Sequence, residues 1–82
     1  MDRKMDMTAY TIIGTKQVLR ALERGELSGA ILADDADPHI RGKLLDALGQ
    51  KNIPFTTQPS MKALGRDCGI EVGAAVVGKP KE

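Results

Sequence analysis

Three short aliphatic runs alternate along the chain with segments of helical periodicity. The runs are Thr11–Ile13, Ala30–Ala33 and Ala74–Val77. None of them alternates between apolar and polar residues, which predicts strands covered on both faces of a sheet. A weaker run, Phe55–Thr57, follows Pro54, which has no N–H to donate, so this strand is expected at an edge of the sheet.

Three segments between these runs place apolar residues at helical spacing, namely Thr15–Arg24, Pro38–Gln50 and Ser60–Cys68. Suitable capping residues stand at their ends: Gly25 after the first, Asp37 and Pro38 at the start of the second, and Ser60 and Gly69 around the third. The stretch Asp2–Tyr10 is a candidate for a further short helix. Strands that alternate with helices predict an α/β sandwich, and the short connections predict a single domain over residues 1–82.

The composition narrows the classes of function. The formal net charge is only +1, so a nucleic-acid partner requires positive charge gathered on one face. Tyr10 and Phe55 are the only aromatic residues, which argues against single-strand recognition by stacked rings. The lone Cys68 cannot form an internal disulfide and fits a reducing cytoplasm. No apolar run approaches the ~18 residues of a membrane span, and the N-terminus lacks a secretory apolar region.

The segment Gly14-Thr15-Lys16-Gln17 leads from a predicted strand directly into a predicted helix. Such a start leaves backbone N–H groups and the positive end of the helix dipole open to a phosphate. Lys16, Arg20 and Arg24 follow at intervals of four and predict an exposed basic stripe roughly 12 Å long. The Gln17 amide beside them offers donors and acceptors to base edges. An ordinary solvated helix face, partly neutralised by Glu23, explains the same pattern about as well.

A second candidate segment is Gly69-Ile70-Glu71-Val72-Gly73, between the last predicted helix and strand. Ile70 and Val72 have no evident core role there, and exposed apolar side chains in a loop can pack against an unstacked base. The equally open alternative is that they begin the final strand. Lys62 and Arg66 add a smaller basic pair on the preceding helix.

The remaining polar residues do not predict catalysis or metal binding. Asp34, Asp35 and Asp37 lack the glycine and distal glutamate of a calcium loop and suit caps and turns better. His39 has no partner nucleophile, and Cys68 lies in an apolar stripe. The phosphate-loop spacing of nucleotide hydrolases is absent around Gly14. We therefore expect no enzyme, no metal and no cofactor.

Four motifs in order resemble a known family. Residues 12–17 and 21–25 are similar to the first RNA-contact segment of the kink-turn-binding ribosomal protein superfamily (seven-Ae and thirty-e type). Residues 33–38 look like its strand-to-helix joint, and residues 60–65 and 68–75 look like its closing helix, contact loop and last strand. The resemblance covers nearly the whole chain and is strongest to the small bacterial YbxF-type proteins.

This resemblance implies a three-layer α-β-α sandwich with a mixed four-stranded sheet. It also implies binding to kink-turns, which are sharply bent RNA duplexes with a bulge and sheared G·A pairs. Two sets of residues would contact the RNA: Gly14, Thr15, Lys16, Gln17 and Arg20 at the G·A pairs, and Ile70, Glu71 and Val72 at the bulge. Archaeal members carry Asn-Glu where this chain has Lys16-Gln17, so the base contacts at these two positions do not transfer directly.

The implied partner is an rRNA, including that of the ribosome, or an mRNA element such as a riboswitch. We expect the protein to be a monomer in the cytoplasm. The alternative is a peripheral ribosome-associated structural protein held mainly by protein contacts. The near-neutral charge favours that alternative.

Overall fold

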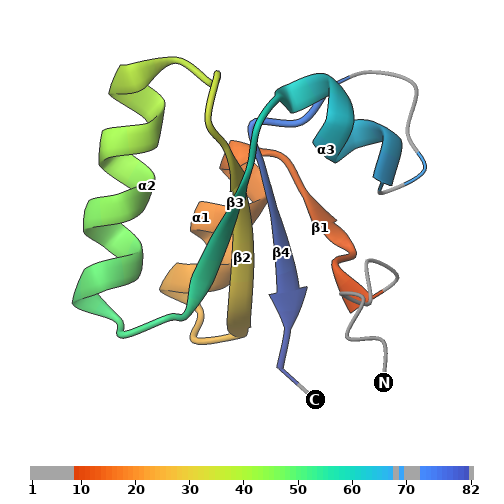
Figure 1. The fold of residues 1–82 in the computed structure, drawn as a ribbon. Coiled ribbons are helices and arrows are strands. Elements are labelled where there is room, and N and C mark those ends of the chain that lie inside the picture. The colour runs from red at the N-terminus through yellow and green to blue at the C-terminus, as the bar shows by residue number, and fades with distance from the viewer. Residues whose placement is uncertain (1–8, 68, 70–72, 82) are drawn as a thin grey trace, which may run out of the picture.

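The computed structural model describes residues 9–67, 69 and 73–81. Strands and helices alternate along this part of the chain (Figure 1). The elements in order are β1 (Ile12–Ile13), α1 (Thr15–Glu23), β2 (Leu27–Ala33), α2 (Pro38–Gln50), β3 (Phe55–Gln58), α3 (Met61–Asp67) and β4 (Val76–Pro80). The predicted segment Asp2–Tyr10 lies almost entirely outside the described residues.

The four strands form one mixed sheet in the order β1-β4-β2-β3. β4 runs antiparallel to both β1 and β2, whereas β2 and β3 are parallel. Helices α1 and α2 cover one face of this sheet and α3 covers the other (Figure 1). The predicted three-layer α-β-α sandwich with a mixed four-stranded sheet is therefore confirmed, and so is the edge position of β3.

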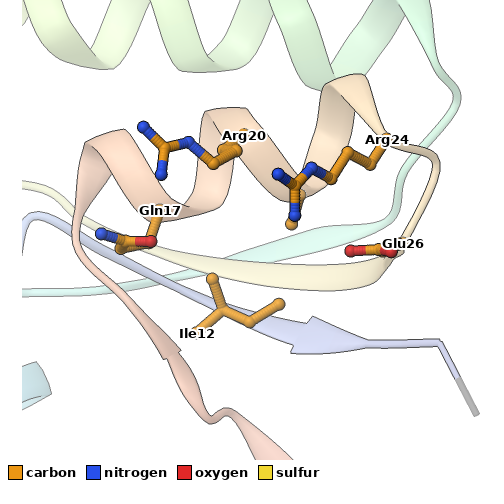
Figure 2. Close-up of a pocket in the computed structure, with 6 residues that line it drawn as sticks. Ile12, Gln17, Arg20, Arg24 and Glu26 are labelled. Atoms are coloured by element: carbon orange, nitrogen blue, oxygen red, sulfur yellow. The ribbon is translucent and has the colours of Figure 1, made fainter.

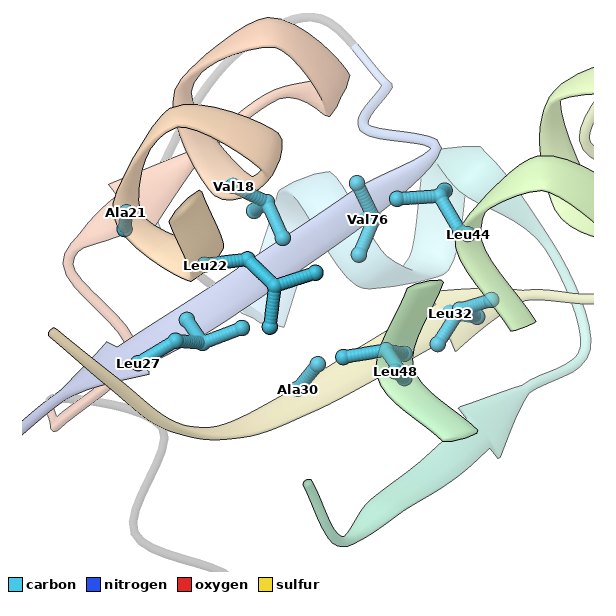
Figure 3. Packing of buried hydrophobic residues seen from close by; sticks show 9 residues of the cluster. All are labelled: Val18, Ala21, Leu22, Leu27, Ala30, Leu32, Leu44, Leu48 and Val76. Atoms are coloured by element: carbon cyan, nitrogen blue, oxygen red, sulfur yellow. The ribbon is translucent and has the colours of Figure 1, made fainter. Parts of the chain in front are cut away.

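The alternation of side chains along the central strand β2 divides the core in two. Ala30 and Leu32 face α1 and α2, where Leu44 and Leu48 pack against them (Figure 3). Ile31 and Ala33 face the opposite side, in a second cluster with Leu64 of α3. Because β2 is covered on both faces, its sequence is a continuous aliphatic run rather than an alternating one.

The helix ends follow the predicted capping chemistry. Gly25 has a φ of +71° and, with Glu26, returns two backbone hydrogen bonds to the last turn of α1, which is the Schellman arrangement. The Asp37 side chain accepts a hydrogen bond from the His39 N–H at 2.8 Å, directly before Pro38 at the first position of α2. Ser60 caps α3 through the Ala63 N–H at 3.0 Å.

β1 and β3 differ from the predicted ranges by one residue each, and the other two strands differ by more. β2 begins at Leu27 rather than Ala30, and β4 spans Val76–Pro80 rather than 74–77. The extra residues pair with each other, since Leu27 and Gly29 lie opposite Pro80 and Lys79. Local propensity disfavours glycine and proline in strands, so this extension comes from pairing between distant segments rather than from either segment alone.

Candidate nucleic-acid interface

The start of α1 is open to solvent and held in place by the sheet. Gly14 has a φ of +102°, in a region that favours glycine, and provides no side-chain cap. Its N–H donates to the Val76 carbonyl at 3.0 Å, and its carbonyl accepts from the Val18 N–H at 3.0 Å. The N–H groups of Thr15, Lys16 and Gln17 come before the first bond of the helical ladder, as at any helix start. Thr15 is half-buried, whereas Lys16 and Gln17 are exposed.

At the starts of the other two helices, side chains accept hydrogen bonds from the first backbone N–H groups. The Asp37 carboxylate occupies the start of α2. At the start of α3, Ser60 bonds the Ala63 N–H, and the Asp35 carboxylate accepts from the Met61 N–H at 2.7 Å. Within the described part of the chain, α1 is thus the helix whose first N–H groups meet no side-chain acceptor.

Among the described residues, the cations on the outer face of α1 form no ion pair. Arg20 and Arg24 are exposed, as predicted, whereas Val18 and Leu22 are buried against the core and Ala21 is buried beside the arginines. Among the described residues, no carboxylate lies within 4.0 Å of these arginines or of Lys16, and Glu23 is exposed as well. The charges of this face are therefore available to an external anion.

A hollow of about 170 Å³ lies along this face, between α1 and β1 (Figure 2). Gln17, Arg20 and Arg24 surround it from α1, and Ile12 of β1 and Glu26 complete the lining with Ala21. Lys16 is not among the lining residues, so the structure groups Gln17 rather than Lys16 with the two arginines. The pattern of the sequence did not indicate Ile12 or Glu26, because both reach the hollow from outside the helix.

The second predicted contact segment is described only at its glycines. Ile70, Glu71 and Val72 lie outside the described residues. Gly69 has a φ of +79° and its N–H donates to the Arg66 carbonyl. Gly73 lies against α3, where an added Cβ would approach the Met61 backbone to 3.1 Å. Three residues after Gly73 the chain reaches Val76, whose carbonyl accepts a hydrogen bond from the Gly14 N–H, so the start of β4 lies beside the start of α1.

The acidic residues after β2 have structural roles. Asp35 and Asp37 cap α3 and α2, and Asp34 forms an ion pair with Arg41 at 3.8 Å. No group of three potential metal ligands occurs among the described residues. His39 is exposed, and Cys68 lies outside the described part. Lys62 and Arg66 are both exposed on α3, as their spacing predicted.

Within the described ranges, no helix has the length and apolarity needed to cross a membrane.

The fold and the site together define the class of protein: a small α-β-α sandwich in which the start of one helix is exposed and carries positive charge. Residues 2–82 match the Ribosomal protein L7Ae/L30e/S12e/Gadd45 family, and the chain belongs to this family. The predicted membership in the seven-Ae and thirty-e type of ribosomal protein superfamily is thereby confirmed.

Relatives of known name and structure agree with this assignment. The chain is 49% identical over 74 residues, 90% of each chain, to an RNA-binding protein of Geobacillus sp. (strain WCH70). It is 50% identical over 66 residues, 80% of each chain, to the RNA-binding protein YbxF of Geobacillus stearothermophilus. A solved structure, the 15.5 kD RNA-binding protein of Giardia lamblia, superposes with a TM-score of 0.77 at 34% identity, over 85% of this chain and 59% of the other.

Proposed function

We propose that this protein binds RNA kink-turns through the start and outer face of α1 together with the segment 69–73. The observation that carries the proposal is the hydrogen bond from the Gly14 N–H, at the start of α1, to the carbonyl of Val76, which follows Gly73 by three residues at the start of β4. The names of the relatives, which describe RNA-binding proteins, support the class of ligand.

Each described residue of the first segment has a chemical role in this proposal. The free N–H groups at Thr15 and Lys16, with the dipole of α1, attract a phosphate. Arg20 and Arg24 bind backbone phosphates along the hollow, since guanidinium groups suit bidentate contacts with phosphate. The Gln17 amide can donate and accept, which suits the edges of the sheared G·A pairs.

In the second segment, we assign Ile70, Glu71 and Val72 to the bulge of the kink-turn. An unstacked base there would pack against the two apolar side chains. Because the major groove of regular A-form RNA is too narrow for side chains, the kink itself creates the readable surface. The protein then stabilises the bent RNA by binding it in preference to the extended form.

In this proposal the protein acts by binding rather than by catalysis, as a cytoplasmic monomer, and its RNA is an rRNA or an mRNA element. A titration followed by fluorescence anisotropy tests the central claim. One probe is a kink-turn RNA, and the control is the same RNA with both G·A pairs replaced by Watson–Crick pairs. We expect tighter binding to the kink-turn by at least about tenfold, which corresponds to 1.4 kcal/mol. Equal affinity for the two RNAs would contradict kink-turn recognition.

A further inference from the structure

A second hollow, of about 280 Å³, lies between α1 and α2 on the flank of α1 opposite to the hollow in Figure 2. We call it the interhelix groove. Leu22 of its lining belongs to the larger core cluster, whose buried side chains are drawn in Figure 3, and Leu19 and Ala47 pack against that cluster. Its lining comes from both helices: Leu19, Leu22 and Glu23 from α1, and Lys43, Ala47, Gln50 and Lys51 from α2 and its end.

The middle of the groove is apolar and its α2 rim is basic. Leu19 and Ala47 are half-buried and pack on the core, whereas Lys43 and Lys51 are exposed. Lys43, Ala47 and Lys51 succeed one another at intervals of four, so they share one stripe of α2 about 12 Å long. A small side chain thus lies between two lysines, and this leaves room for an apolar group from outside.

Among the described residues, no carboxylate forms an ion pair with the lysines of this rim. Over the part of the chain that the structure describes, the single ion pair joins Arg41 and Asp34. The nearby Asp46 carboxylate instead accepts a hydrogen bond from the Gln50 side chain at 3.4 Å. The ammonium groups of Lys43 and Lys51 therefore remain available for carboxylates of another molecule.

We propose that the interhelix groove docks an acidic amphipathic helix of a partner protein. One apolar side chain of that helix would enter the groove above Ala47, and carboxylates about one turn before and one turn after it would meet Lys43 and Lys51. Laying an apolar helix stripe in a groove between helices is a common mode of peptide recognition. The two lysines of the α2 rim favour a partner helix with negative charge. Glu23, on the α1 rim, would repel further carboxylates of that helix on its side of the groove.

This inference goes beyond the proposed RNA binding and does not depend on it. The groove lies on the opposite flank of α1 from Arg20 and Arg24. An RNA at that flank and a peptide in the groove can be bound together, so the protein would link a folded RNA to an acidic protein.

The test uses two synthetic helical peptides and the full chain labelled for amide NMR. The first peptide has a central leucine with glutamates one turn before and after it, and the second has lysines in place of the glutamates. We expect the glutamate peptide to shift the amide signals of residues 19–23 and 43–51, and the lysine peptide to leave them unchanged. Absence of shifts, or equal shifts with both peptides, would overturn the proposal.

Reversing the charge of the two lysines on the α2 rim tests whether these lysines attract the peptide. The double variant Lys43→Glu, Lys51→Glu should lose affinity for the glutamate peptide by about tenfold, because two exposed ion pairs are replaced by repulsion between like charges, and should gain affinity for the lysine peptide. The double variant Lys62→Glu, Arg66→Glu on α3 carries the same change of net charge and should keep the wild-type affinity. An equal loss in the α3 variant would assign the attraction to net charge alone and overturn the proposal.

Two further readouts separate the groove from other surfaces. Ala47→Leu, at a half-buried helical position, should fill the groove and abolish binding of the glutamate peptide while circular dichroism shows an unchanged fold. Kink-turn RNA should bind the charge-swapped groove variant as it binds the wild type. If the charge-swapped variant lost RNA affinity, the groove would belong to an RNA-binding surface. If the same amide signals moved with protein concentration alone, the groove would belong to a contact with a second copy of the chain.

Discussion

The backbone N–H of Gly14 donates to the carbonyl of Val76 at 3.0 Å, and this hydrogen bond joins segments from opposite ends of the chain. It ties the start of α1 to the start of β4, shortly after the glycine-flanked segment 69–73. The Val18 side chain, one turn into α1, packs in the same core cluster as Val76. The position of the open helix start is therefore set by the sheet, and the proposed two-part RNA surface depends on this junction.

The first prediction concerns the contribution of the cationic side chains Lys16 and Arg20 to RNA affinity. Lys16→Ala and Arg20→Ala should each weaken binding to kink-turn RNA by several-fold. Each should also flatten the plot of log affinity against log salt by about 0.7–0.9 for one lost phosphate contact. Anisotropy titrations at several salt concentrations measure both quantities. Lys51→Ala, which removes the same charge at the far end of α2, serves as the control and should leave affinity and slope close to wild type.

Gln17→Ala should affect discrimination rather than salt dependence. The amide is neutral, so its loss removes no counterion-releasing contact, but it removes donors and an acceptor proposed for the G·A pairs. We expect the ratio of affinities between the kink-turn RNA and its Watson–Crick control to fall by about tenfold, since a good base contact contributes roughly 1–3 kcal/mol. A change in salt slope with an unchanged ratio would show that Gln17 does not read bases.

Gly78 lies where β4 packs closely against buried side chains of β2 and α1, so it leaves little room for a side chain of its own. A Cβ at this position would lie 2.5 Å from Leu27 Cδ1 and 3.3 Å from Val18 Cγ2. Gly78→Ala should therefore lower the free energy of unfolding by about 1–3 kcal/mol. Gly42, in α2, has no heavy atom within 4 Å of an added Cβ, so Gly42→Ala should raise stability by roughly 0.5–1 kcal/mol. Urea denaturation of the two variants should show opposite signs, and equal shifts would contradict this account.

Two neighbouring aspartates should differ in their effect on stability. Asp35 caps α3 through the Met61 N–H at 2.7 Å, so Asp35→Ala should cost about 1 kcal/mol. Asp34 forms only a 3.8 Å ion pair, with half of its side chain exposed, so Asp34→Ala should change stability by less than about 0.5 kcal/mol. Thermal unfolding compares the pair directly. A larger effect of Asp34→Ala would show that its pair with Arg41 matters more than the α3 cap.

The sequence by itself determined the elements whose signals are local. The apolar stripes of α1, α2 and α3 were readable because a helix repeats every 3.6 residues, and the caps at Asp37 and Ser60 act within a few residues of their own position. The charged outer face of α1 followed from the same periodicity. The buried runs in β2 and β4 were recognised as strands because they are short, continuous aliphatic runs without apolar/polar alternation.

The tertiary structure alone decided what depends on residues distant in the chain. It extended β2 and β4 through Gly29 and Lys79, since these residues pair with each other against their local propensities. It gave Asp35 a capping role on a helix that begins at Met61. It also grouped Ile12 and Glu26 with Gln17, Arg20 and Arg24 around one hollow. No sequence pattern encodes these contacts locally, because strand order and packing are fixed only when the whole core is buried.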